Sequence, residues 1–338
     1  MRRRTFLLGA AGAVACSRNG PRLNVFNWSS YVAPNTIADF ERESGLRVRY
    51  ATYESVQEML AKVMGGNSGW DVVFPSGEYV EPMRELGLLA PLQHRLLPNL
   101  DALGDEFRTP PWDPGLEWAV PYMQGTTGIV YDRKLAIAEW AGLWAAPLSG
   151  KITMLDDAPE VFGACLKMAG QSLNTADPGM LAAAARRAIQ QKPLLRAYLN
   201  AEVMDQLVAG DISAAQAWGT TAAQAIAAAP DRLAYVLPRE GFARYADNAA
   251  ILKESTRVEA AHKFLNYLLR PRVAADVAMA MHTATCNGAA QALLPAEMRD
   301  DPVLYPDAAT LGRGEWFRAQ SAAAQRLRDR LWTEVKSA

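Results

Sequence analysis

The chain has 338 residues, of which 50% are hydrophobic and 21% are charged, and its formal net charge at pH 7 is −1. This length favours about two domains with ample core, and the lack of a basic excess argues against a nucleic-acid-binding protein. Removal of the leader described next takes away three arginines and no acid, so 35 − 3 = 32 basic residues would face 36 acidic ones. That mild acidity suits a cationic small ligand.

An export signal is predicted at the N-terminus. Three arginines at 2–4 precede an apolar run over 6–15, which is too short to span a bilayer that needs about 20 apolar residues. The pattern is typical of a cleaved signal peptide over 1–15. Small residues before Cys16 resemble a lipoprotein processing site, so 16–22 is expected to form a lipidated tether that holds the protein outside the cytoplasm. The twin-arginine and general export routes are both left open, because paired arginines serve either.

Strands and helices alternate after the leader. The apolar run over 23–31 predicts a strand, and a helix is expected over 34–45, where the final glycine favours a left-handed cap. Period-two alternation over 46–50 predicts a half-buried strand. A second helix over 58–64 and a buried parallel strand over 71–75 complete a βαβαβ series. The series predicts a doubly wound α/β sheet with ligands at the carboxyl ends of its strands.

The predicted strand ends carry aromatic and polar side chains. Trp28, Ser29 and Tyr31 end the first strand, and Ser76 and Glu78 follow the third. This arrangement is typical of a ligand wall, although an aromatic turn packed in a core would have the same sequence.

No metal, cofactor or nucleophile motif accompanies these residues. His94, His262 and His282 have no zinc-binding spacing, and neither a phosphate-binding glycine loop nor a G-x-S-x-G elbow occurs. We therefore predict no metal site, no cofactor and no enzyme. Cys165 and Cys286 are interpreted as buried thiols, while a disulfide between them is left open.

Several short phrases stand in a fixed order along the chain. They are Leu-Asn-Val-Phe-Asn-Trp-Ser-Ser-Tyr at 23–31, Thr-Tyr-Glu-Ser at 52–55, Trp-Asp-Val-Val-Phe-Pro-Ser at 70–76, Pro-Tyr-Met at 121–123, Leu-Asp-Asp-Ala-Pro-Glu-Val-Phe at 155–162, Leu-Leu-Arg-Pro at 268–271 and Tyr-Pro-Asp-Ala at 305–308. Together they resemble the substrate-binding proteins of polyamine (spermidine/putrescine) ABC importers over essentially the whole mature chain.

The resemblance implies the two-lobed periplasmic-binding-protein fold. Each lobe would be a mostly parallel sheet flanked by helices, and the ligand would lie in the cleft between the lobes. Carried onto this sequence, lobe 1 would hold 23–122 plus 246–291, and lobe 2 would hold 123–245 plus 292–338.

A polyamine site needs carboxylates at each nitrogen and apolar or aromatic faces between them, because a polyamine is a row of ammonium groups separated by methylenes. The resemblance assigns the ligand-binding residues as Trp28, Ser29, Tyr31, Ser76, Glu78, Asp157, Glu160, Trp218, Tyr245, Asp247, Thr283 and Phe317. Asp157 and Glu160 also fit an N-terminal capping box before a helix. On an extended segment, Tyr245 and Asp247 would point the same way.

The chain also departs from the family pattern. Glu78 and Thr283 stand where spermidine-binding members have Tyr, Tyr245 stands where they have Trp, and Phe317 stands where they have Gln. Thr221 stands where putrescine-binding relatives have Asp. The acids of the site are kept while its lining has changed, so an amine ligand is expected and its identity is left open.

The hypothesis is a monomeric extracytoplasmic solute-binding protein, tethered through Cys16, that captures a polyamine or related cationic amine and delivers it to an ABC permease. One alternative is an enzyme that uses Asp157, Glu160 or Glu78 as acid and base on an extracellular substrate, which would require carboxylates with separated pKa values. The other is a sensor with the same fold that docks a receptor and has no role in transport.

Overall fold

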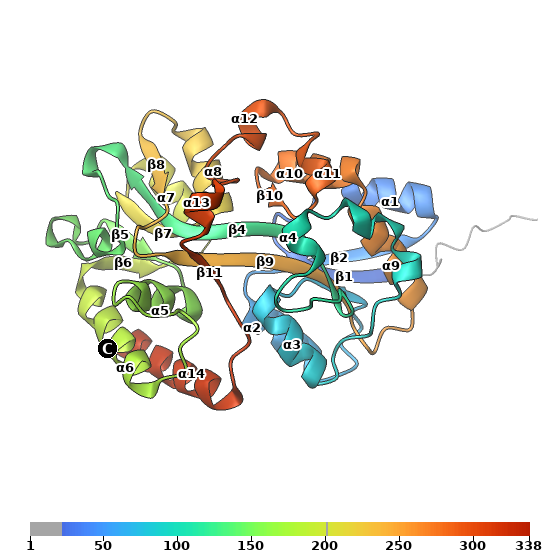
Figure 1. The fold of residues 1–338 in the computed structure, drawn as a ribbon, viewed down its shortest axis with the longest axis horizontal. Coiled ribbons are helices and arrows are strands. Elements are labelled where there is room, and N and C mark those ends of the chain that lie inside the picture. The colour runs from blue at the N-terminus through green and yellow to red at the C-terminus, as the bar shows by residue number, and fades with distance from the viewer. Residues whose placement is uncertain (1–21, 201) are drawn as a thin grey trace, which may run out of the picture.

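The computed structural model describes residues 22–200 and 202–338 (Figure 1). The predicted signal peptide and Cys16 lie outside the described residues. Strand β1 (Arg22–Trp28) already includes Arg22, the residue at which we expected the tether to end. Within the described part of the chain, no helix is long and apolar enough to cross a membrane.

Two lobes make up the molecule, and we name lobe 1 as the one built around β1, β2 and β3. These strands run parallel in the order β2-β1-β3. Gly45 ends α1 in the left-handed conformation, with φ +72°, as the sequence predicted. The elements in this part of the chain are β1, α1 (Thr36–Ser44), β2 (Arg47–Tyr53), α2 (Val56–Val63), β3 (Val72–Val73), α3 (Gly77–Glu85) and α4 (Asp105–Arg108). The alternation predicted from the sequence is confirmed.

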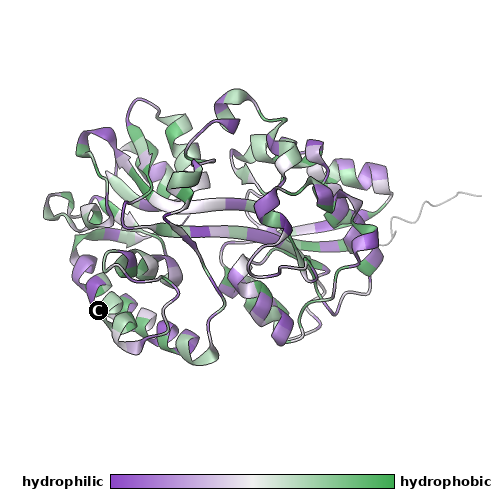
Figure 2. Cartoon of the chain, viewed as in Figure 1, coloured by the Kyte–Doolittle hydropathy of each residue, from purple (hydrophilic) through white to green (hydrophobic). Residues whose placement is uncertain are grey.

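Lobe 2 is built around the parallel strands β7, β5 and β6, which lie in that order. A core of apolar side chains from α5, α6 and β5 fills it, and Figure 2 shows hydrophobic and hydrophilic residues mixed along its helices. Its elements are β5 (Ile152–Met154), α5 (Ala158–Lys167), α6 (Pro178–Gln191), β6 (Leu195–Tyr198), α7 (Val203–Ala209), β7 (Ala214–Trp218), α8 (Gly219–Ala228) and β8 (Leu233–Val236).

Two long antiparallel strands, β4 (Ala119–Asp132) and β9 (Phe242–Ile251), run from one lobe to the other, as Figure 1 shows. Up to Thr126, β4 pairs with β9, and from Thr127 it pairs with β7. The sheet is therefore mixed, with parallel strands in each lobe and antiparallel strands where the chain crosses between them.

The chain then completes lobe 1 and crosses a third time. The remaining elements are α9 (Val258–Leu268), α10 (Pro271–Met281), β10 (Ala284–Thr285), α11 (Gly288–Gln291), α12 (Ala296–Arg299), α13 (Ala308–Leu311), β11 (Gly314–Trp316) and α14 (Ala322–Ser337). Strand β11 pairs with β9, and α14 packs against α5 and α6. The C-terminal helix thus belongs to lobe 2.

Cys165 and Cys286, the cysteines within the described residues, lie in different cores. Cys165 belongs to the core of lobe 2 and Cys286 to that of lobe 1, and both thiols are free. The sequence left open a disulfide between them, and the structure shows that they do not form one.

Candidate functional site

A cavity of about 200 Å³ lies between the lobes, where strand ends from both sides meet. It is smaller than the sites of drug-sized ligands, which run to about 300–1,000 Å³. Every predicted site residue except Thr283 lines it. The residues are Trp28, Ser29, Tyr31, Ser76, Glu78, Asp157, Glu160, Trp218, Tyr245, Asp247 and Phe317. The structure therefore brings together side chains that lie up to 289 positions apart in the sequence, from 28 to 317.

Thr283 is the predicted residue that does not line the cavity. Its side chain is buried, and its hydroxyl lies 2.7 Å from the hydroxyl of Thr220, which does line the cavity. Thr283 therefore supports the wall from behind.

Asp247 is the acid of the lobe 1 end. It lies on β9 two residues after Tyr245, and both side chains face the cavity, as the alternation of a strand requires. One carboxylate oxygen accepts a 2.7 Å hydrogen bond from the Tyr31 hydroxyl, and the other accepts a 2.6 Å bond from the Ser76 hydroxyl. Burial raises the pKa of Asp247 to about 6, although these two hydrogen bonds oppose the rise.

Asp157 and Glu160 form the acidic pair of the lobe 2 end. Asp157 caps α5, because its carboxylate accepts a 3.1 Å hydrogen bond from the backbone N–H of Glu160. The Glu160 carboxylate turns toward lobe 2 neighbours, where one oxygen accepts from the Thr127 hydroxyl at 2.7 Å and the Trp218 indole N–H at 3.0 Å. Asp157 therefore caps α5 and also lines the cavity.

The other oxygen of Glu160, Oε2, is buried and accepts no hydrogen bond from the described residues. A buried acceptor without a donor is costly, typically about 1–3 kcal/mol and more for a charged group. Burial first, and then repulsion from Asp157, raise the pKa of Glu160 to about 8. The same two effects disfavour its charged form until a donor arrives. Burial likewise raises the pKa of Asp157 to about 6.

Glu78 adds a carboxylate from the first turn of α3. Burial raises its pKa to about 8, opposed by its own backbone N–H and assisted by repulsion from Asp157 and Asp247. Glu54, at the end of β2, also lines the cavity and accepts a hydrogen bond from Ser29. Among the residues that the structure describes, no lysine, arginine or histidine lines the cavity. The site is thus strongly acidic.

The aromatic side of the cavity is held in place by hydrogen bonds. The Trp28 indole N–H donates to the carbonyl of Phe74 at 2.9 Å, and its ring lies 6.3 Å from that of Tyr31. The Tyr122 hydroxyl donates to the Tyr31 carbonyl at 2.6 Å. Fixed aromatic faces beside carboxylates form a surface that attracts cations.

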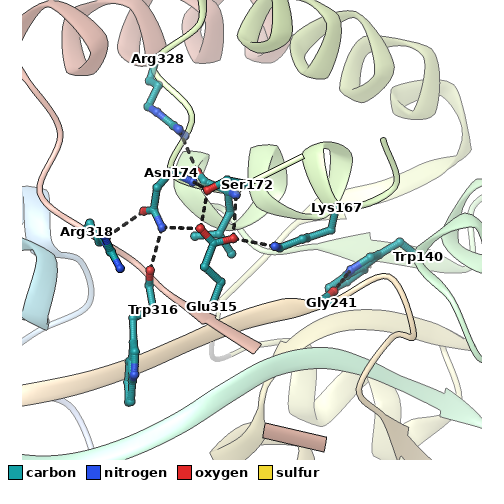
Figure 3. A network of polar contacts seen from close by, with 10 residues as sticks. Trp140, Lys167, Ser172, Asn174, Gly241, Glu315, Trp316, Arg318 and Arg328 are labelled. Atoms are coloured by element: carbon teal, nitrogen blue, oxygen red, sulfur yellow. Dashed lines mark hydrogen bonds and ion pairs between the residues drawn. The ribbon is translucent and has the colours of Figure 1, made fainter. Parts of the chain in front are cut away.

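Phe317 reaches the cavity because its neighbours are tied to lobe 2. Figure 3 shows Asn174 donating to the carbonyl of Trp316 at 2.8 Å and accepting from the backbone N–H of Arg318, also at 2.8 Å. Glu315 accepts from Lys167 at 2.6 Å in the same network. Asn174 thereby brackets Phe317 and fixes the third crossing segment beside the cavity.

Other lining residues escaped the sequence interpretation. Glu54 had a signal, because it follows a predicted strand at the same sheet edge as Trp28. Helix residues such as Gln224 had none, since nothing local distinguishes a cavity-facing amide from a surface one. The lining residues that the sequence did not indicate are Ser30, Glu54, Val56, Tyr79, Asn200, Met204, Thr220 and Gln224. Thr221, noted above only as a departure from the family pattern, lines the cavity as well. In the described parts of the chain, no cluster of three or more His, Cys, Asp or Glu side chains could hold a metal ion.

The family model of bacterial extracellular solute-binding proteins matches residues 35–306, which is more than half of the chain. The chain belongs to this family. The spermidine/putrescine-binding periplasmic protein of Salmonella typhimurium (strain LT2) is 35% identical to this solute-binding protein over 319 residues, covering 91% of each chain.

Two solved structures share the fold at full length. The spermidine/putrescine ABC transporter substrate-binding protein of Streptococcus pneumoniae has a TM-score of 0.82 and 28% identity, covering 94% of this chain and 99% of its own. A lipoprotein of Treponema pallidum has a TM-score of 0.84 and 27% identity, covering 93% and 99%. The predicted two-lobed α/β fold of this solute-binding protein is confirmed.

Proposed function

We propose that this solute-binding protein captures a polyamine or a related cationic amine outside the cytoplasm and delivers it to an ABC permease. One observation carries the proposal: four carboxylates, two of them buried and two partly exposed, share with several aromatic faces a cavity that no basic side chain of the described residues lines. The four are Asp247, Glu78, Asp157 and Glu160. The printed names of the relatives, which describe spermidine- and putrescine-binding proteins and an ABC transporter substrate-binding protein, support the same ligand class and the same partner.

Each feature of the cavity matches one part of a polyamine. Ammonium groups donate charge-assisted hydrogen bonds to carboxylates, and the Oε2 atom of Glu160 accepts no hydrogen bond from the described residues. The methylene segments would lie against Trp28, Tyr245 and Phe317. The predicted roles of the lining residues in binding follow from this match and are part of the proposal.

Binding would close the two lobes around the ligand. We place their boundaries at 23–122 plus 246–291 for lobe 1 and 123–245 plus 292–338 for lobe 2. The switch of β4 from β9 to β7 near Thr126 supports a hinge in this region. A ligand drives closure only through better contacts in the closed form. Small-angle scattering should show a smaller radius with saturating spermidine, and an unchanged radius would contradict closure.

The membrane anchor is a further part of the proposal. Acylation of Cys16 would tether a monomeric binding protein near its permease, and the Treponema pallidum relative is described as a lipoprotein. Cys16→Ser should move the protein from the membrane fraction to the soluble fraction without changing its ligand affinity. Unchanged fractionation would refute the lipid anchor at Cys16 and would leave the proposed amine binding untouched.

Calorimetric titration of the mature protein tests the function directly. Putrescine, spermidine, spermine and agmatine are compared with amino acids, whose carboxylate would meet the acidic cavity. Binding of at least one amine and rejection of the amino acids are expected. Rejection of all the amines would overturn the proposal. Analysis of the recovered amine for chemical change tests the proposed lack of catalysis, and conversion of the amine would favour the enzyme alternative.

A further inference from the structure

The three segments that cross between the lobes meet in one row of the sheet. In the strand register, Thr126 of β4 and Trp316 of β11 both pair with Arg244 of β9. β4 leaves β9 at the same row, because its next residue, Thr127, already pairs with β7. A rotation of one lobe against the other is therefore expected to bend the sheet at Thr126, Arg244 and Trp316, which we call the hinge row.

The hinge row has one face toward the cavity and one face away from it. Tyr245 and Phe317, which follow Arg244 and Trp316 in the chain, line the cavity. Successive side chains of a strand point to opposite faces, so Arg244 and Trp316 lie on the face away from the cavity, and neither lines it. There the Arg244 guanidinium lies over the Trp316 ring, with its Cζ atom 4.1 Å from the ring centroid.

Lobe 1 contacts this far face of the hinge row through α4 and the loop that follows it. The Arg244 guanidinium donates a 2.7 Å hydrogen bond to the Glu106 carboxylate and forms an ion pair with it. The Trp316 ring packs edge to face against Trp112 and Phe107, with ring centroids 5.2 Å and 6.2 Å away. We call these contacts the clasp.

The segment that carries Trp316 is fixed to lobe 2. Its neighbour Glu315 accepts hydrogen bonds from Lys167 at 2.6 Å and from the Asn174 side chain at 2.9 Å, as Figure 3 shows. Trp316 therefore moves with lobe 2, whereas the rings against which it packs belong to lobe 1. The clasp is thus a contact between the lobes on the side of the hinge row opposite to the cavity.

Closing the cavity draws the clasp apart, because two bodies that rotate about a hinge approach each other on one side and separate on the other. A contact that is lost on closure stabilises the open form, and the ligand affinity falls with the population of the closed form. We propose that the clasp of Glu106, Arg244 and Trp316 holds the lobes open and thereby sets the ligand affinity from outside the cavity. This inference rests on the proposed function, because it assumes that an amine closes the lobes.

Glu106→Ala removes the ion pair of the clasp. Asp105→Ala is the matched control, because Asp105 is the neighbouring acid of α4 and pairs with Arg108 inside the same helix. Both positions are exposed, and both variants lose one negative charge, which by itself weakens the attraction for a cation. In calorimetric titrations, Glu106→Ala should nevertheless bind spermidine about twofold to fivefold more tightly than Asp105→Ala, the range expected for a partly exposed ion pair.

A measurement without ligand separates this inference from the proposed function. Pulsed electron paramagnetic resonance between spin labels on one exposed position of each lobe reports the closed fraction of the ligand-free protein. This fraction should be larger in Glu106→Ala than in Asp105→Ala. An equal closed fraction, or an equal or weaker spermidine affinity of Glu106→Ala, would overturn the inference. If the wild type binds no amine but the closed fraction still rises, the proposed function is wrong and the clasp is supported.

Discussion

The buried acids at the two ends of the cavity differ in how their carboxylate oxygens are hydrogen-bonded. At the lobe 1 end, each oxygen of Asp247 holds a hydroxyl donor, from Tyr31 or Ser76. At the lobe 2 end, Glu160 gathers both of its donors on one oxygen and leaves Oε2 without any. Asp247 is therefore an acceptor oriented before the ligand arrives, whereas Glu160 is an acceptor kept open at a cost in stability. Under the proposed function, Asp247 would position an ammonium group, and an ammonium group would supply the donor that Glu160 Oε2 lacks.

The largest effect is expected when the charge is removed at either end. Asp247→Asn and Glu160→Gln should each weaken spermidine binding by about 2–5 kcal/mol, because the ammonium group loses its buried partner. Calorimetric titration measures the change. Glu139→Gln is the control, since Glu139 pairs with Arg239 on the surface and does not line the cavity. Wild-type affinity in both cavity variants would show that neither end holds the ligand.

The next largest effect is expected in the pH dependence of binding, which should differ between the Glu160 end and the Asp247 end of the cavity. An amine binds the ionised carboxylate, and the pKa is about 8 for Glu160 and about 6 for Asp247. Below pH 8 the Glu160 end must release a proton, so affinity should rise between pH 6 and 8 by up to about tenfold per unit for each such group. Titrations at pH 6, 7 and 8 in buffers with different ionisation heats count the protons. A flat profile would contradict the raised pKa, and Glu160→Gln should reduce the slope.

Substitutions of Glu160 and Asp247 should change the stability of the ligand-free protein in opposite directions. The pKa of Glu160 rises from 4.5 in the unfolded chain to about 8 in the fold, so its stabilising proton is fully held below pH 4.5 and is lost as the pH rises through 8. Glu160→Gln should therefore raise the free energy of unfolding by ~1 kcal/mol at pH 8 and by less at pH 5.

Asp247→Ala should instead lower the free energy of unfolding by ~1–3 kcal/mol, since Tyr31 and Ser76 lose their acceptor. Urea unfolding without ligand, at pH 5 and pH 8, measures both variants. If the two substitutions shift stability in the same direction, the contrast between the two ends is wrong.

The smallest effect is expected from the segment beside the lobe 2 end. Asn174→Ala removes the bonds that bracket Phe317, and we expect spermidine affinity to fall by about threefold to tenfold as Phe317 loosens. Asn99→Ala is the control, because the Asn99 side chain likewise donates a hydrogen bond to a backbone carbonyl, that of Asn266, away from the cavity. Both variants should lose some stability. Equal spermidine affinities of the two variants would show that Asn174 does not contribute to binding.

The fold of lobe 1 was predictable because its signals are local. Alternation over 46–50 and the glycine at 45 are readable without knowledge of the rest of the chain, and β2 and the end of α1 lie where they indicated. The long strands β4 and β9 had no comparable signal, since each is buried partly in one lobe and partly in the other. Their role as crossing strands appears only when the sheet is assembled.

Most of the residues that line the cavity could be predicted from the sequence, whereas the hydrogen bonds that orient them could not. The sequence could not show that Asp157 caps α5 while Glu160 lines the cavity, because the orientation of Glu160 depends on Thr127 and Trp218, from other strands. The position of Thr283 outside the cavity lining has the same origin. Which side chain faces a cavity depends on its neighbours in space, here Thr220.

A crystal structure of the protein with bound spermidine tests the central claim most directly. The account predicts an ammonium nitrogen within hydrogen-bond distance, about 2.7–3.2 Å, of the Glu160 Oε2 atom, to which no described residue donates a hydrogen bond. A second nitrogen should lie against Asp247. A complex in which Oε2 still lacks a donor, or in which spermidine lies outside the cavity, would contradict the account.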